Sequence, residues 1–215
     1  MNIEQTRFNM IEQQIRPWNV LDKELLDMLL VVKREDYFPE AQRSLVFMDT
    51  ELPLPDGSKA LFPRVEARIV QEIMPKKTES VLLIGAQSGY LAALLAHMTR
   101  HVTVLELSPV LKQLAEKNLA ANGVRNVTVL AENGLVGQHS GSYDIIIVAG
   151  GLEAAPENLK KQLNNGGRLL AFVGRDPVMH AQITTRTAAG FTEQSVFETV
   201  LPLIAGAEPV SHFQF

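Results

Sequence analysis

Short aliphatic runs alternate with helical patterns along most of the chain after residue 76. Apolar runs bounded by turn formers predict strands, and apolar residues three or four positions apart predict helices. The predicted strands are 81–84, 102–106, 127–130, 145–149 and 168–173, and the predicted helices are 89–99, 109–122 and 155–163. Continuous aliphatic strands are typical of parallel sheets buried on both faces. The alternation therefore predicts an α/β fold with a doubly wound, mostly parallel sheet.

Two glycine pairs are expected to end elements of this series. Gly150 and Gly151 follow the fourth aliphatic run, where we expect them to break the strand. Gly166 and Gly167 are expected to end the helix predicted over 155–163.

The last part of the chain carries strand patterns with no helix of usual length between them. These patterns cover 181–187 and 194–201, with Ala189 and Gly190 near the turn. They predict an antiparallel hairpin that closes the edge of the sheet. A five-strand series followed by such a hairpin resembles the superfamily of methyltransferases that use S-adenosylmethionine.

Residues 1–75 are predicted to form a helical and loop extension that packs on a core over 76–215, within one structural unit. Helical spacing predicts helices near 4–16, 22–33 and 65–74. The second helix has Asp22 as its expected N-cap, and the first is expected to end at Pro17.

The stretch 37–63 is rich in proline and is predicted to be mostly loop. Loops over a rigid sheet often grip substrates, which is one interpretation of this stretch. The other is a covering segment that only shields apolar surface. The residue pattern leaves both interpretations open.

Composition narrows the classes of function. The chain has 215 residues, of which 46% are hydrophobic and 20% charged, as in an ordinary soluble globular protein. A net charge of −4 argues against a nucleic-acid partner. The absence of cysteine excludes disulfides and thiolate catalysis and fits a cytoplasmic protein. Neither a signal peptide nor an apolar run of membrane-spanning length is visible, so no membrane partner is expected.

The sequence contains no motif typical of a metal site or of a serine hydrolase. Among the histidines only His97 and His101 are four residues apart, and no acidic residue stands beside them. We therefore expect no metal site. No G-x-S-x-G sequence is present, which argues against a serine nucleophile on this type of fold.

The turn after the first predicted strand is a candidate ligand loop. The strand stops at Gly85, Gly89 follows four residues later, and a helical pattern then begins. Glycines at such a turn let a helix N-terminus approach a nucleotide-like ligand. The alternative is a plain strand-to-helix turn, because Gln87 stands where a full glycine motif has its middle glycine.

Two polar residues follow the next two strands. Glu106 ends the second strand, 21 residues after Gly85, where an acidic residue can accept hydrogen bonds from ribose hydroxyls. A solvated carboxylate is the alternative, but the spacing and the strand context favour ligand binding. Asn133 follows the third strand and could pair with an adenine edge, or it could simply form a turn with Gly134.

Several segments of the chain resemble the protein-L-isoaspartate (D-aspartate) O-methyltransferase family, over roughly residues 7 to 204. Val32–Pro39 resembles the family's V-P-R-x-x-F-V-P segment, Asp49–Leu54 resembles E-D-x-P-L-P-I, Leu83–Tyr90 resembles E-I-G-T-G-S-G-Y, Asp144–Gly167 resembles the fourth-strand and G-G-R region, and Leu201–Leu203 resembles the late V-P-L.

The resemblance implies a methyltransferase that uses S-adenosylmethionine to methylate a carboxylate of damaged aspartyl residues in a protein or peptide. It implies cofactor contacts at Gly85, Gln87, Ser88, Gly89, Glu106, Leu107, Asn133, Gly134 and Ala149, and acceptor contacts at Leu61 and Pro63. No catalytic residue is assigned, because a carboxylate acceptor is already ionised at neutral pH and the reaction mainly needs alignment. No oligomeric state follows from the sequence.

Departures from the family pattern fall at expected working positions. Leu83 replaces an acid, Gln87 replaces the middle glycine, Asn133 lies in the stretch that replaces G-D-G, and Leu61 replaces the substrate-loop serine. One hypothesis is a methyltransferase whose substrate is shifted. The second is a catalytically degenerate family member that acts as a binding or interaction module. A nicotinamide-dependent oxidoreductase is disfavoured by the broken glycine motif and by the terminal hairpin.

Overall fold

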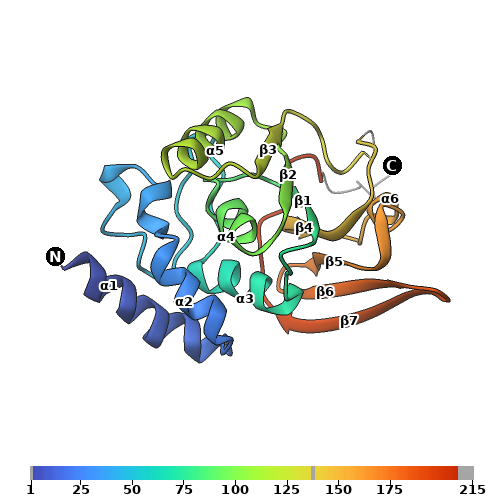
Figure 1. Ribbon diagram of the computed structural model, residues 1–215, viewed down its shortest axis with the longest axis horizontal. Helices are drawn as coiled ribbons and strands as arrows, with labels where there is room; N and C mark the ends of the chain where they lie inside the picture. The colour runs from blue at the N-terminus through green and yellow to red at the C-terminus, as the bar shows by residue number, and fades with distance from the viewer. Residues whose placement is uncertain (1, 137–138, 208–215) are drawn as a thin grey trace, which may run out of the picture.

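The computed structural model describes residues 2–136 and 139–207, and a seven-stranded sheet forms its centre (Figure 1). The strands are β1 Ser80–Ile84, β2 His101–Leu105, β3 Val127–Leu130, β4 Tyr143–Leu152, β5 Leu163–Arg175, β6 Val178–Thr187 and β7 Gly190–Glu198, in the spatial order β3-β2-β1-β4-β5-β6-β7. Pairing is parallel from β3 to β5 and antiparallel from β5 to β7. The predicted mostly parallel sheet with a terminal antiparallel hairpin is confirmed.

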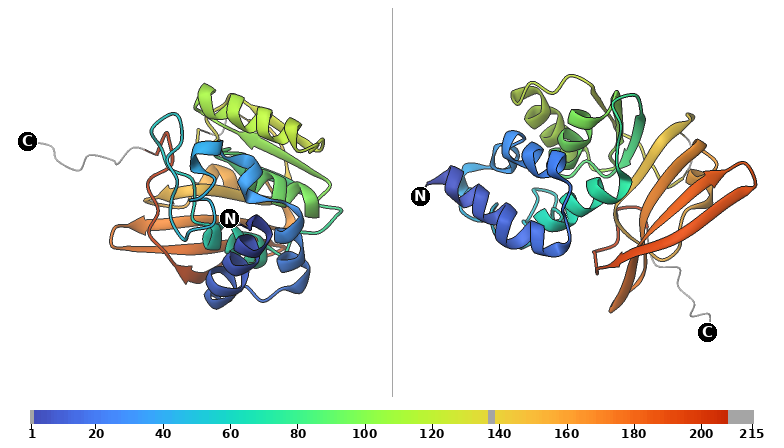
Figure 2. Two further views of the ribbon diagram at one scale, coloured as in Figure 1. Left: turned by 90° about the vertical axis from the view of Figure 1, so that its left-hand side faces the viewer. Right: turned by 60° about the horizontal axis from the view of Figure 1, so that its bottom comes forward.

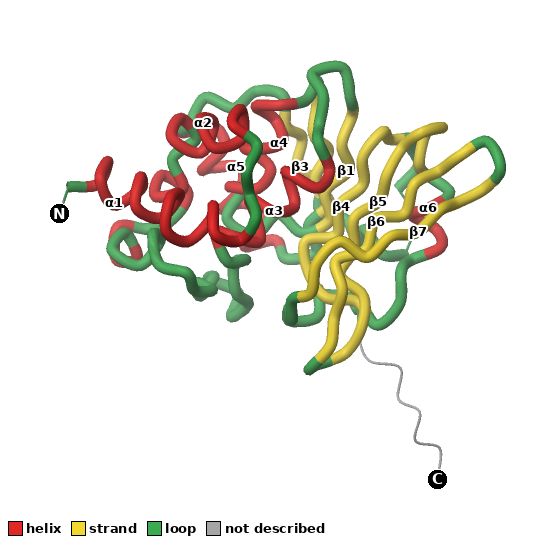
Figure 3. The backbone as a smooth tube through the Cα atoms, turned by 90° about the horizontal axis from the view of Figure 1, so that it is seen from below, coloured by secondary structure: helices red, strands yellow, loops and turns green. Residues whose placement is uncertain are grey.

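Helices gather at one side of this sheet, and the hairpin of β6 and β7 extends away from them (Figures 2 and 3). They are α1 Ile3–Met10, α2 Lys23–Val31, α3 Pro63–Ile73, α4 Tyr90–Met98 and α5 Pro109–Ala121. The single turn α6 Glu157–Lys160 lies apart from them (Figure 3), and its Leu159 packs on the opposite face of the sheet. Asp22 caps α2 by accepting a hydrogen bond from the Leu25 N–H, as expected. No helix among the described residues is long and apolar enough to cross a membrane.

The aliphatic strands divide their side chains between two buried layers. Leu83 of β1 lies in the layer that includes the helices, whereas Leu82 and Ile84 belong to the layer on the opposite face. Leu83 is fully buried, so the apolar residue at this position packs in the core and does not line a cavity. The leucine that replaces the family's acid at this position therefore contributes to core packing.

Three predicted boundaries were wrong. The strand β4 continues through Gly150 and Gly151, because Gly151 exchanges backbone hydrogen bonds with Pro202 and Ile204 of the C-terminal segment. The helix expected over 155–163 is only the short α6, because Leu163 already pairs with the start of β4. Gly166 and Gly167 therefore do not end a helix but lie within β5.

The third wrong boundary lies near the N-terminus. Pro17 does not end the first helical segment, which continues as a π-helical turn, Ile11–Ile15, and a 3₁₀ turn, Arg16–Trp18. Proline is tolerated early in such a turn because its missing N–H needs no partner there. Asn19 ends the segment instead, with a left-handed backbone conformation at φ 61°.

A buried arginine holds the long loop that precedes α3. The guanidinium of Arg34 is 2.8 Å from the Glu66 carboxylate and donates to the carbonyl oxygens of Val46 and Leu61 at 2.8 and 2.9 Å. The Arg34 side chain has no exposed surface. The loop is therefore fixed by tertiary contacts although it contains few regular elements.

Replacing Arg34 with methionine is expected to lower the free energy of unfolding by about 3–5 kcal/mol, because Glu66 would remain as an unpaired buried charge. Urea unfolding measures this change. Lys23 is the control, because its side chain is 86% exposed beside Asp27 and Lys23→Met should cost less than about 0.5 kcal/mol. Equal losses in the two variants would contradict the role assigned to Arg34.

Candidate functional site

A cleft of about 250 Å³ lies at the carboxyl ends of β1, β2 and β4. It brings together five of the predicted site residues, namely Leu61, Gly85, Gln87, Glu106 and Ala149. A larger cavity of about 610 Å³ lies between α2, α4 and α5, but no predicted site residue lines it. The smaller cleft is therefore the candidate functional site.

Gln87 projects its side chain across this cleft. Its Oε1 accepts a hydrogen bond from the Leu61 N–H at 3.1 Å, and its Nε2 donates to the Ala149 carbonyl at 2.9 Å. The backbone of Gln87 has φ 49°, so it adopts the left-handed conformation that glycine would take at this position. The side chain points into the cleft and joins the loop before α3 to the end of β4.

Glu106 lies at the base of the cleft, and only 4% of its surface is exposed. Its two carboxylate oxygens accept hydrogen bonds from the N–H groups of Ala86 and Ser108, at 2.7 and 2.8 Å. These contacts tie the glycine turn after β1 to the end of β2. A carboxylate has about four acceptor positions, so two remain for hydroxyl groups of a ligand.

The other predicted site residues do not line the cleft. These are Pro63, Ser88, Gly89, Leu107, Asn133 and Gly134. A Cβ on Gly89 would lie 3.2 Å from the backbone of Ala115, so this glycine permits the close approach of α5. The Asn133 side chain instead accepts a hydrogen bond from the Leu135 N–H at 3.0 Å. Their predicted contacts with a ligand stay predictions.

The C-terminal segment, residues 201–207, covers one wall of the site, and sequence reasoning missed it. Figure 1 shows this red segment running back from β7 across the sheet to end near β3. Ile204 donates its N–H to the Gly151 carbonyl at 3.0 Å, and its side chain would be 3.3 Å from a Cβ placed on Gly85. Gly206 lies against the amide of Asn133. The glycine pair after the fourth aliphatic run, predicted to break the strand, is the sequence feature that could have revealed this close approach.

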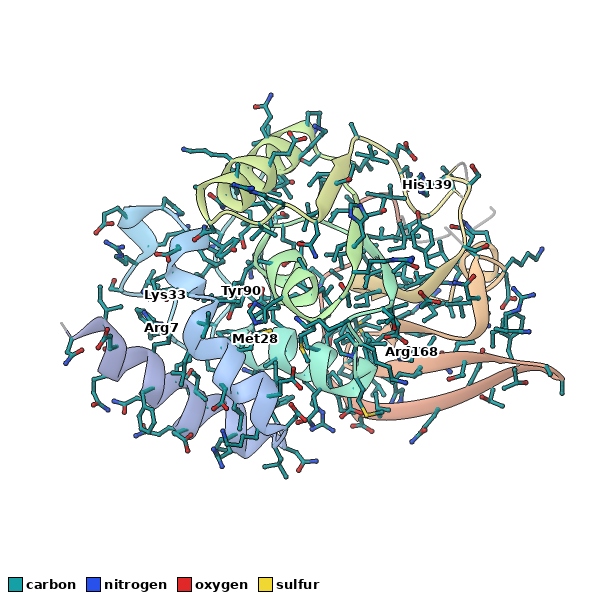
Figure 4. The ribbon with its side chains drawn as sticks, in the orientation of Figure 1. Arg7, Met28, Lys33, Tyr90, His139 and Arg168 are labelled. Atoms are coloured by element: carbon teal, nitrogen blue, oxygen red, sulfur yellow. The ribbon has the colours of Figure 1, made fainter. Side chains whose placement is uncertain are left out.

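A second polar cluster lies away from the cleft and was also missed. His139 contacts Tyr143 through Nε2 at 2.7 Å and Glu132 through Nδ1 at 3.1 Å. Figure 4 places His139 on the side of the molecule opposite Arg7 and Lys33. Burial raises the pKa of Tyr143, so this phenol stays protonated at neutral pH.

Tyrosines near the glycine turn provide no base. Burial raises the pKa of Tyr37 to about 12, and it also raises the pKa of Tyr90 beneath the turn. Both side chains therefore remain neutral phenols. Among the described residues, no group of three histidine or acidic side chains could hold a metal ion.

The residues present fit the nucleoside part of the cofactor implied by the resemblance better than its amino-acid end. Glu106 has free acceptor positions beside the glycine turn, as a ribose requires. However, Gln87 bonds two backbone groups and Ile204 packs against Gly85 and Gly150 at the end of the cleft near Ala149, and Gly206 lies against Asn133 at the other end. The cleft of about 250 Å³ is also smaller than the roughly 300–1,000 Å³ of typical ligand pockets. The amino-acid end of the cofactor therefore has no free backbone partners beside Gln87 in this conformation, whereas the carboxylate of Glu106 is available to the ribose.

Comparison with known proteins gives a consistent result. The family model described as protein-L-isoaspartate(D-aspartate) O-methyltransferase matches residues 5–206. Two protein-L-isoaspartate O-methyltransferases of Rhodopseudomonas palustris are similar to the chain. One, from strain HaA2, is 39% identical over 79% of this chain and 70% of its own. The other, from strain ATCC BAA-98 / CGA009, is 34% identical over 93% of each chain.

A solved structure has a similar fold. It is a Plasmodium falciparum protein described as a protein-L-isoaspartate O-methyltransferase, in complex with S-adenosyl-L-homocysteine. Its TM-score is 0.78, with 18% identity, and the alignment covers 94% of this chain and 98% of that one.

The role of Glu106 in holding the turn gives a stability prediction. Glutamine has the same size, but its NH₂ would face one of the two backbone N–H donors. We expect Glu106→Gln to lower the free energy of unfolding by about 1–3 kcal/mol, measured in urea. The control is Glu116→Gln, which removes an exposed carboxylate paired with Lys112. It should lower the free energy of unfolding by less than about 0.5 kcal/mol. A Glu106 variant as stable as this control would contradict the assigned contacts.

Proposed function

The chain belongs to the protein-L-isoaspartate(D-aspartate) O-methyltransferase family, and we propose that it transfers a methyl group from S-adenosylmethionine to a carboxylate of damaged aspartyl residues in a protein or peptide. The observation that carries this proposal is the match over residues 5–206, which includes every segment that lines the candidate cleft. The loop with Leu61, the glycine turn and Glu106 meet there, as a two-substrate site requires.

S-adenosylmethionine supplies a methyl group activated by its positive sulfur. The chain's own residues would then have three tasks. Glu106 would hold the ribose, the loop at Leu61 would form the wall on the acceptor side, and the apolar side chains of the cleft would exclude water. Alignment of the two reactants accounts for most of the required rate enhancement, because an acceptor carboxylate is already ionised.

The acceptor side of the cleft departs from the family pattern in the groups that it offers to an acceptor. Leu61 offers an apolar side chain, its N–H is bonded to Gln87, and its carbonyl accepts from Arg34. The loop therefore has no free hydroxyl or backbone donor at this position for an acceptor carboxylate. Recognition of the acceptor would depend on shape and on neighbouring groups instead.

A methylation assay tests the proposal directly. The substrates are a peptide with one isoaspartyl residue and the matched peptide with normal aspartate. We expect methyl incorporation into the isoaspartyl peptide only. Binding of S-adenosylhomocysteine without turnover would mean that the acceptor is different. Neither binding nor turnover would favour the second hypothesis, a binding or interaction module.

The dependence of the rate on pH gives a second check. None of the described residues that line the cleft is a histidine, and the acceptor needs no deprotonation near neutral pH. We therefore expect the single-turnover rate of methyl transfer to stay level between about pH 6 and 8, and to fall only as the acceptor carboxylate becomes protonated near pH 4. A bell-shaped profile centred near neutrality would reveal an acid–base residue beyond the three roles assigned to the cleft.

A further inference from the structure

The sheet order sets the direction in which a bound cofactor must lie. Asn133, Glu106 and Gln87 follow the neighbouring strands β3, β2 and β1, and Ala149 lies in the next strand, β4, just past its pairing with β1. If the adenine lies by Asn133 and the ribose by Glu106, as the proposed function requires, the amino-acid end extends past Gln87 toward Ala149. This inference therefore rests on the proposed function.

The amino-acid end carries a charged donor, the ammonium group, and a charged acceptor, the carboxylate. Two backbone groups at this end of the cleft could receive them, the Ala149 carbonyl and the Leu61 N–H. The side-chain amide of Gln87 bonds both, at 2.9 and 3.1 Å. The amide thus presents a donor and an acceptor to the same two partners that the cofactor would use.

The left-handed backbone conformation of Gln87 indicates that its side chain has a role that glycine could not fill. Its φ of 49° is a left-handed conformation that costs a residue with a Cβ free energy, whereas glycine adopts it freely. A turn alone would be satisfied by glycine. The two side-chain hydrogen bonds are what glutamine adds at this position.

We propose that Gln87 is a specificity-determining residue whose amide takes the place of the cofactor's amino-acid end. The cleft then favours a thionucleoside that lacks this end, and S-adenosylmethionine binds only when the Gln87 side chain rotates away. Because the same rotation breaks the bond to Leu61, occupancy of the cofactor site frees the Leu61 N–H on the acceptor side. Gln87 thereby links the two halves of the site.

Two ligands that differ only in the amino-acid end test this proposal. They are S-adenosylhomocysteine and 5′-methylthioadenosine, each titrated calorimetrically into the wild-type protein and into Gln87→Gly. Both contain the same nucleoside, so any effect confined to the nucleoside part of the cleft cancels in the ratio of the two affinities. We expect Gln87→Gly to tighten S-adenosylhomocysteine by about tenfold or more and methylthioadenosine by less than about threefold, because only the former gains hydrogen bonds to its charged groups.

A control separates the amide from the backbone conformation. Met74 also has a positive φ, 46°, and its side chain is exposed away from the cleft. Met74→Gly relieves comparable backbone strain and should leave both affinities unchanged. Gln87→Asn keeps an amide and tolerates the left-handed conformation, but it is too short to bond both partners, so it should shift the ratio as Gln87→Gly does.

The possible outcomes distinguish the proposals. If Gln87→Gly changes both affinities equally, or changes neither, the glutamine is a structural tie and the specificity role is wrong. If S-adenosylhomocysteine binds the wild type at least as tightly as methylthioadenosine and the variant preserves that preference, the role is also wrong, although the proposed function stands. If no variant binds either ligand, the proposed function fails together with this inference.

Discussion

The buried guanidinium of Arg34 fixes the position of the loop on which the acceptor side of the site depends. Removing a charge from water is costly, and the ion pair with Glu66 and the two backbone carbonyls offset that cost only in one arrangement. The rings of Phe38 and Tyr90 lie 4.6 and 5.9 Å from the guanidinium carbon and complete its surroundings. Leu61 is thus placed from beneath by Arg34, while Gln87 holds it from the side of the cleft.

Hydrophobic periodicity was sufficient to predict the sheet and the position of Glu106, because each depends on residues close together in the chain. The parallel pairing of these strands followed from the alternation of strands and helices, whereas their spatial order, β3-β2-β1-β4, comes from the structure. The end of β4 and the direction of the Gln87 side chain depend on tertiary contacts, so the periodicity could not predict them. Gly150 stays within a strand only because residues 202–204 pair beside it, and no local pattern indicates where the Gln87 side chain points.

The residues that depart from the family pattern have different roles in the structure. Leu83 belongs to the buried layer beneath the helices and has no access to the cleft. Gln87 and Leu61 instead contact one another at the centre of the site. Sequence comparison gives these three positions the same weight, whereas the structure assigns one to packing and two to recognition.

The glycine pair in β4 and the C-terminal segment constrain each other during divergence. A Cβ at Gly151 would lie 2.6 Å from the Met179 side chain and 2.8 Å from the Leu201 carbonyl, and one at Gly150 would meet Ile204 at 2.8 Å. A side chain acquired at either glycine would displace the segment from the carboxyl end of β4 and open the wall of the cleft. Relatives that differ at these glycines should therefore have rebuilt their C-terminal segments as well, so the two regions evolve as a unit.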